Sequence, residues 1–188
     1  MKKIASKKSD SKKKQVILGV ILVFVMFGSV FGIVVNSFGK DANSGKIEYN
    51  GFEFAEQNGF WLTSVGNLNL GFRNNPEEVE NVYSEGFFLI ENYYNKPLYI
   101  DSKNYETSSE IYANLKGIAL RIQPGCFELP CEENAPFKTC EDNLIIIEEG
   151  ETPLIIANES CVFIRGPEEN LTEITDDFLF KLFEIREQ

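Results

Sequence analysis

Histidine is absent from this chain of 188 residues. It is the usual general base near neutral pH and the commonest metal ligand among side chains. Its absence excludes Ser-His-Asp and Cys-His nucleophilic schemes and zinc hydrolases with histidine ligands. Loops of the Walker or G-x-G-x-x-G type are also missing, so no loop is present to hold nucleotide phosphates. We therefore expect no cofactor.

Basic residues are scarce in the second, larger part of the chain. Residues 41–188 contain 10 Lys and Arg against 28 Asp and Glu, and 10 − 28 gives a net charge of −18. A surface of this charge repels nucleic acid, so nucleic acid is not an expected partner. Acidic pairs arise here from composition alone, and the sequence therefore designates no catalytic and no metal-binding residue. We expect a protein that is not an enzyme, with an envelope enzyme using carboxylates or thiols as the alternative.

Charge is also missing from residues 16–35, VILGVILVFVMFGSVFGIVV. At about 1.5 Å per residue, such a helix reaches roughly 30 Å, the thickness of the hydrocarbon core of a bilayer. The run predicts a transmembrane helix over residues 15–38. A cleaved secretory signal is the alternative, since Ser37 and Gly39 offer small residues at a cleavage site. The apolar region of such signals spans only about 7–15 residues, and the greater length favours a retained signal-anchor.

Lysine dominates the charge before this helix. Residues 1–14 hold seven Lys against Asp10, a net charge of +6. The excess of positive charge predicts a cytoplasmic tail at residues 1–14 and a C-terminal domain outside. The expected localisation is the cell membrane, with a single pass and the lipid bilayer as a partner. Gly28 and Gly32 form a small-xxx-small pair, which would let the helix pack against a membrane-protein partner or a second copy in a homodimer.

Residues 39–46 predict a short linker, and residues 47–188 are enough for one domain with a single core. Residues 47–73 alternate apolar and polar side chains around an Asn58-Gly59 turn and a turn at residues 66–67, as in a β-meander. Asn75 and Pro76 predict a helix start, with the helix running through Val82. A strand is expected at residues 87–91.

The rest of the domain predicts a β-α-β step that continues into an antiparallel ribbon. A strand at residues 97–101 precedes a capping box at residues 107–110, which opens a helix with an extension toward residue 122. Three β-rich runs follow at residues 143–148, 153–157 and 161–165. After Pro167, a closing helix carries one apolar stripe that consists of Leu171, Ile174, Phe178, Leu182 and Ile185. The expected fold class is α+β, with a largely antiparallel sheet, two or three helices and a C-terminal amphipathic helix.

Four cysteines, Cys126, Cys131, Cys140 and Cys161, all lie in the predicted outer domain. An even number in an exported segment predicts two disulfides. Three pairings are open, and we favour Cys131 with Cys140 and Cys126 with Cys161. A four-thiolate zinc site and a redox dithiol are the alternatives, although both normally use C-x-x-C spacing, which is absent.

Two sequons, at Asn158 and Asn170, have the form of N-glycosylation acceptors. They agree with an exported domain if the source organism glycosylates proteins.

Several short motifs recur in a known group of proteins. The lysine-rich start and span, together with residues 50–54 (NGFEF), 58–61 (NGFW), 123–126 (QPGC) and 176–180 (DDFLF), resemble small single-pass archaeal membrane proteins with a cysteine-containing outer domain. The resemblance implies topology and domain extent, and no function. A second similarity, to prepilins, rests on residues 13–15, but a lysine replaces the small residue before the cleavage point.

Together these features predict a membrane-anchored extracytoplasmic domain that acts as a non-enzymatic interaction or accessory module. A pilin-like surface subunit is a further alternative to the envelope enzyme.

Overall fold

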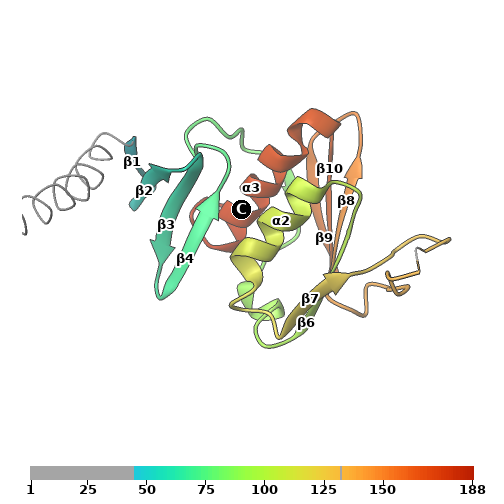
Figure 1. Cartoon of the computed structure of the whole chain (residues 1–188). Coiled ribbons are helices and arrows are strands. Elements are labelled where there is room, and N and C mark those ends of the chain that lie inside the picture. Colours follow the sequence, from blue (N-terminus) through green and yellow to red (C-terminus); the bar gives the residue numbers. More distant parts are fainter. Residues whose placement is uncertain (1–44, 132) are drawn as a thin grey trace, which may run out of the picture. The chain divides into compact units, whose positions relative to one another are not determined.

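In the described part of the chain, two β-sheets and two α-helices form the fold (Figure 1). The structure is a computed structural model, and it describes residues 45–131 and 133–188. The strands are β1 (Lys46–Tyr49), β2 (Phe52–Gln57), β3 (Phe60–Val65), β4 (Leu68–Phe72), β5 (Ser84–Glu85), β6 (Pro97–Ser102), β7 (Arg121–Pro124), β8 (Leu144–Glu149), β9 (Leu154–Asn158) and β10 (Cys161–Gly166). The helices are α2 (Tyr105–Leu115) and α3 (Leu171–Leu182), with 3₁₀ turns η2 (Ile90–Asn92) and η3 (Glu168–Asn170).

The described residues form one compact unit, Gly45–Gln188. The predicted cytoplasmic tail at residues 1–14, the transmembrane helix at 15–38, most of the linker at 39–46 and the pair Gly28 and Gly32 lie outside the described residues. Within residues 45–131 and 133–188, no helix has the length and the apolar character needed to cross a membrane.

The first sheet is the predicted meander, in which β1 to β4 pair antiparallel in chain order. The expected Asn58-Gly59 turn joins β2 to β3, and an Asn50-Gly51 turn that we did not predict joins β1 to β2. Their φ angles are 49° and 83° at Asn50 and Gly51, and 54° and 78° at Asn58 and Gly59. Two-residue hairpins favour Asn-Gly because both turn positions need positive φ.

The second sheet has six strands in the order β5-β9-β10-β8-β6-β7. Only the pair β9 and β10 is antiparallel, whereas the other four pairs of neighbouring strands are parallel. The α+β class is thus confirmed, and antiparallel pairing holds for the meander, but the second sheet is mainly parallel. The predicted β-α-β step is β6-α2-β7, because a parallel pair requires a crossover.

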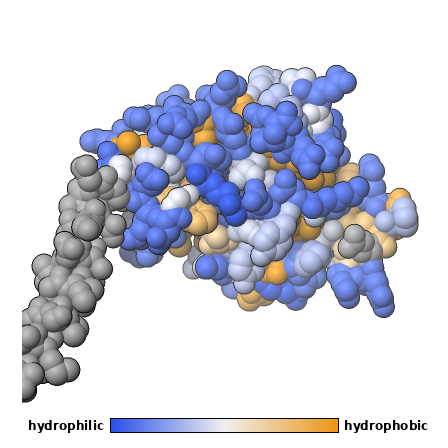
Figure 2. All heavy atoms as spheres, turned by 45° about the horizontal axis from the view of Figure 1, so that its top comes forward, coloured by the Kyte–Doolittle hydropathy of each residue, from blue (hydrophilic) through white to orange (hydrophobic). Residues whose placement is uncertain are grey.

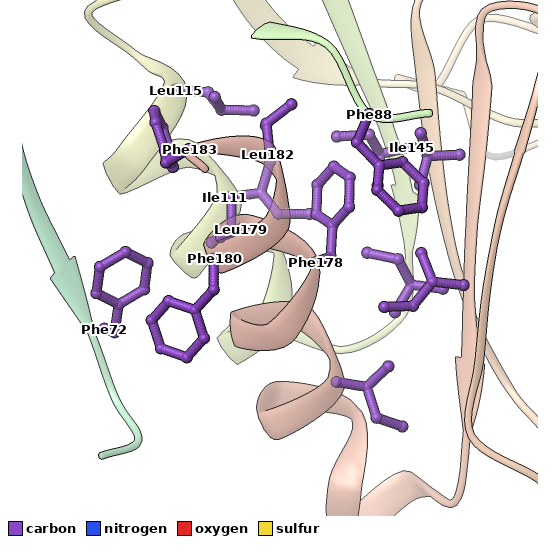
Figure 3. Packing of buried hydrophobic residues seen from close by; sticks show 14 of the residues in the cluster. Phe72, Phe88, Ile111, Leu115, Ile145, Phe178, Leu179, Phe180, Leu182 and Phe183 are labelled. Atoms are coloured by element: carbon purple, nitrogen blue, oxygen red, sulfur yellow. The ribbon is translucent and has the colours of Figure 1, made fainter. Parts of the chain in front are cut away.

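Helices α2 and α3 lie between the two sheets and contact both (Figure 1). Phe180 of α3 points toward the meander, with its ring centroid 4.6 Å from that of Phe72. Phe178 points the other way, 5.4 Å from Phe88 near the second sheet (Figure 3). The predicted C-terminal helix therefore forms, but it is buried nearly all round, and one apolar stripe does not describe its packing.

Three local predictions are wrong. Residues 75–82 form turns and irregular backbone, and residues 87–91 contain no strand. Helix α2 begins two residues before the expected capping box, because the Asn104 side chain accepts the amides of Glu106 and Thr107. It ends at Leu115; residues 116–120 of its expected extension form turns and bends, and only Arg121 and Ile122 belong to β7.

Candidate functional site

The six-stranded sheet has an inner face on α2 and α3 and an outer face on the opposite side. Paired residues of neighbouring strands share a face, and alternate residues along a strand change face. Ile155, Val162 and Ile164 are buried on the inner face in the main core. Ile156 pairs with Phe163, which pairs with Ile146, and this row lies on the outer face.

The loop of residues 125–143 covers one part of the outer face. A second apolar cluster forms beneath it, around Tyr99, Leu144, Ile146 and Cys161. Phe127 of the loop packs edge-on against Phe163, with 5.4 Å between ring centroids. The Phe127 amide also donates to the Asp101 carboxylate at 2.7 Å, which fixes the loop on β6.

Two disulfides hold this loop, and their number confirms the sequence prediction. The favoured pairing is wrong, since Cys126 bonds to Cys131 and Cys140 bonds to Cys161. The Ser160 amide donates to the Cys140 carbonyl at 3.2 Å, so that Cys140 lies beside the start of β10. The first bridge closes the loop tip, and the second bridge joins the loop to the sheet. The four thiols are therefore not ligands for zinc, and no cysteine is free.

Beyond the loop, the outer face opens into a groove of about 260 Å³. It is lined by Leu154, Ile156, Asn158, Phe163 and Arg165, which we call the outer-face groove. Its floor is apolar because β9 and β10 place three large apolar side chains side by side. Arg165 does not give the groove free positive charge, because its Nε donates to Glu148 at 2.9 Å.

Acidic side chains border this groove. Glu85 pairs in register with Ile156, so that it shares the outer face at the β5 edge. Glu159 lies in the β9–β10 turn, and Glu148 neutralises Arg165. Apolar residues are scattered among hydrophilic ones on the face in Figure 2. Apolar patches rimmed by polar residues are typical of interaction sites and ligand-binding grooves.

The two sequons fall at different places. Asn158 is exposed at the end of β9 and lines the outer-face groove. Asn170 is half-buried and stands directly before α3. A glycan on Asn158 would lie beside the groove.

A second group of polar residues caps the free edge of β4. The Asn114 side chain accepts the Gly71 amide at 3.0 Å and donates to the Gly71 carbonyl at 2.9 Å. Glu110 accepts the Arg73 amide at 3.1 Å, and Asp176 accepts the Asn74 amide at 2.9 Å. These side chains from α2 and α3 replace a missing neighbouring strand. We call Asn114, Glu110 and Asp176 the edge cap.

A third group holds the irregular segment of residues 74–84, which we call the strap. Arg186 donates to the carbonyls of Pro76 at 2.8 Å, Val79 at 3.0 Å and Glu80 at 3.2 Å. Lys181 donates to the Val82 carbonyl at 2.5 Å. Both cations also bind Asp177, which has no exposed surface. Buried carbonyls outside regular structure need such donors, and this explains the charges inside the core.

Sequence reasoning missed these buried charges. The available signal was the pair Asp176 and Asp177 together with Lys181 inside an otherwise apolar helix. The predicted single apolar stripe implies that the other side chains of the helix face water. Among the described residues, no group of three or more His, Cys, Asp or Glu side chains could hold a metal ion.

A second hollow, of about 730 Å³, is polar and open. Three acidic residues, Glu77, Glu184 and Glu187, line it together with Arg186. That guanidinium is already occupied by the strap carbonyls and Asp177.

Comparisons with protein-family models, curated proteins and solved structures find no match for this chain.

Proposed function

We propose that this protein is a membrane-anchored interaction module whose extracytoplasmic domain binds a basic, apolar polypeptide segment of a partner in the outer-face groove. The observation that carries the proposal is the groove itself, where Leu154, Ile156 and Phe163 form an apolar floor on the sheet face opposite α2 and α3. Large apolar side chains grouped on a surface are typical of binding sites.

Charge complementarity defines the partner. The groove is bordered by Glu85, Glu148 and Glu159, and the only cation that lines it, Arg165, is paired with Glu148. Residues 41–188 carry a net charge of −18, from 10 basic and 28 acidic residues. Such a surface attracts basic segments and repels acidic ones. The apolar floor adds the requirement for aliphatic or aromatic side chains.

Anchoring is supported by the sequence. The uncharged run at residues 16–35 is long enough to span a bilayer, and the lysines at residues 1–14 favour a cytoplasmic tail. A domain held at a membrane surface meets membrane-bound partners at high effective concentration. A weak groove contact is then sufficient for function.

The alternative of an envelope enzyme has less support from the geometry. Converging carboxylates are present at Glu110 and Asp176, but they are 3% and 0% exposed and line neither hollow. An enzyme needs its acid and base within reach of a substrate. Both pairs of thiols are oxidised to disulfides, so thiol chemistry has no free nucleophile.

Peptide binding tests the proposal. Full-length protein in nanodiscs is titrated with a fluorescent peptide of alternating Lys and Leu, and with a Glu and Leu peptide of equal length. Empty nanodiscs give the background. We expect anisotropy to report binding of the basic peptide only, with an affinity that falls as salt rises because the attraction is screened.

Two groove variants and one surface control locate the site. Ile156→Asp and Leu154→Asp should each weaken binding at least about tenfold, because a charge on the apolar floor costs about 1.4 kcal/mol or more. Tyr105→Asp changes a side chain that is 83% exposed at the start of α2 and should bind like the wild type. Circular dichroism confirms that each variant folds. Equal binding of both peptides, or equal loss in the Tyr105 variant, contradicts the proposal.

A further inference from the structure

We propose that Glu110 and Asp176 share a single proton, which makes the junction between the meander and the helices a latch that tightens in acid and loosens in base. The latch joins the end of β4 to α2 through Glu110 and to α3 through Asp176. This inference is independent of the groove.

Geometry places the two carboxyl groups side by side. They accept consecutive backbone amides, Glu110 from Arg73 at 3.1 Å and Asp176 from Asn74 at 2.9 Å. Arg73 and Asn74 are consecutive residues, so the two carboxyl groups that accept their amides are neighbours at the end of β4. Oδ1 of Asp176 is buried and has no donor from the protein. Two carboxylate oxygens repel at such a contact, so a proton between them supplies the missing donor.

The charges around Glu110 and Asp176 balance only if the two carboxyl groups hold one proton between them. Arg73, at the end of β4, places Nε 3.3 Å from Oε2 of Glu110. The neighbouring Glu106 of α2 is exposed and lies 3.9 Å from the Arg73 guanidinium. Asp177 of α3 is occupied by Lys181 and Arg186. One cation therefore faces two buried carboxyls, and a second negative charge would be uncompensated.

Burial, and then the neighbouring Glu110 charge, raise the pKa of Asp176 well above its usual range. Burial also raises the pKa of Glu110. A raised carboxyl pKa means that the folded state holds a proton that the unfolded chain releases. The shared proton therefore contributes its full stabilisation below the carboxyl pKa of the unfolded chain, near 4. This contribution falls as pH rises from there to the raised pKa of the folded state.

The latch controls how firmly the meander is held. Gly71, Arg73 and Asn74 use the edge cap in place of a neighbouring strand. Loss of the shared proton creates repulsion at that edge, and the amides of β4 should open to solvent before the six-stranded sheet does. The expected consequence is a domain whose meander docks more tightly in an acidic environment.

Denaturant unfolding of the full-length protein in nanodiscs, from pH 5 to pH 8, tests the latch. Few other groups titrate in this window, because the chain has no histidine and the cysteines are bonded. We expect the unfolding equilibrium constant to rise with pH, approaching about tenfold per pH unit where one proton separates the two states. Hydrogen exchange should show the rise first in peptides that contain residues 68–74.

Asp176→Asn and Glu110→Gln each replace the proton with an amide that can donate the same hydrogen bond. Both should flatten the pH dependence, whatever their effect on stability at a single pH. Glu106→Gln changes an exposed acid near the same arginine and should keep the wild-type slope. A flat wild-type curve, or an unchanged slope in both Asp176→Asn and Glu110→Gln, overturns the shared proton.

Discussion

Arg186 shows how single residues shape this fold. Its guanidinium donates to three strap carbonyls, to Asp177 and, at 2.8 Å, to the Tyr49 hydroxyl. Apart from a turn at Asn75 and the β5 pairing that begins at Ser84, the strap lacks ladder and helix hydrogen bonds, and these donors take their place. Lysine is a poor substitute, because only the planar guanidinium offers five donors in a fixed geometry.

We predict that Arg186→Met destabilises the protein by roughly 3–5 kcal/mol, because it removes one of the two cations that bind the buried Asp177 and leaves three strap carbonyls without their donor. The measurement is denaturant unfolding at neutral pH. Arg165→Gln is the matched control. Its pair with Glu148 has side-chain exposures of 47% and 39%, and its removal should cost about 0–1 kcal/mol. Equal effects of the two substitutions would show that the strap does not depend on Arg186.

For single residues, the sequence shows which side chains are present but not which of them are buried or what they bind. The absence of histidine is visible directly, but the burial of Asp176, Asp177 and Lys181 follows from a second sheet packing on α3. A single helix pattern contains no information on how many faces are covered. The edge cap and the strap contacts therefore become visible only in the tertiary structure.

Elements defined by short-range signals were predicted well. The Asn58-Gly59 turn and the strands β6, β8, β9 and β10 appear close to their expected positions. The expected helix at residues 75–82 does not form, although Asn75 does cap a turn by accepting the Glu77 amide at 3.0 Å. The helix-start signal was real, but bonds from α3 and from Arg186 determined the backbone instead.

Disulfide pairing also depends on long-range geometry. Cys140 and Cys161 are 21 residues apart and meet because the loop returns to β10, whereas Cys126 and Cys131 are only 5 apart. Peptide mapping without reduction should recover Cys126 linked to Cys131 and Cys140 linked to Cys161. A fragment linking Cys131 to Cys140 would contradict this connectivity.

Removing the bridges should also affect stability unequally. Chain entropy gives about 3 kcal/mol for the longer loop and about 2 kcal/mol for the shorter one. We therefore expect Cys140→Ser with Cys161→Ser to lower the melting temperature more than Cys126→Ser with Cys131→Ser. Only the variant with Cys140→Ser and Cys161→Ser should also lose the packing of Phe127 against Phe163, because that bridge joins the loop to the sheet. The reverse order of melting temperatures would argue against the loop as a cover of the sheet.

At the largest scale, the described part of the chain packs two sheets around α2 and α3, and the loop of residues 125–143 covers only part of the outer sheet face. The buried charges hold the edge cap and the strap, the disulfides hold the loop, and the outer-face groove is an apolar hollow on the sheet face that the loop covers only in part. This division of roles is why we place the function in binding. The proposed anchor and topology rest on the charge pattern of residues 1–38, which is readable from the sequence alone.

Site-specific photocrosslinking in intact cells tests the central claim most directly. A photoreactive residue is placed at position 156 in the groove or, as the matched control, at position 105 on α2. We predict a discrete crosslinked partner from position 156 only, which disappears when the Lys and Leu peptide is added outside the cells and persists with the Glu and Leu peptide. The same products from both positions, or no competition by the basic peptide, would contradict a groove that binds a basic, apolar partner outside the membrane.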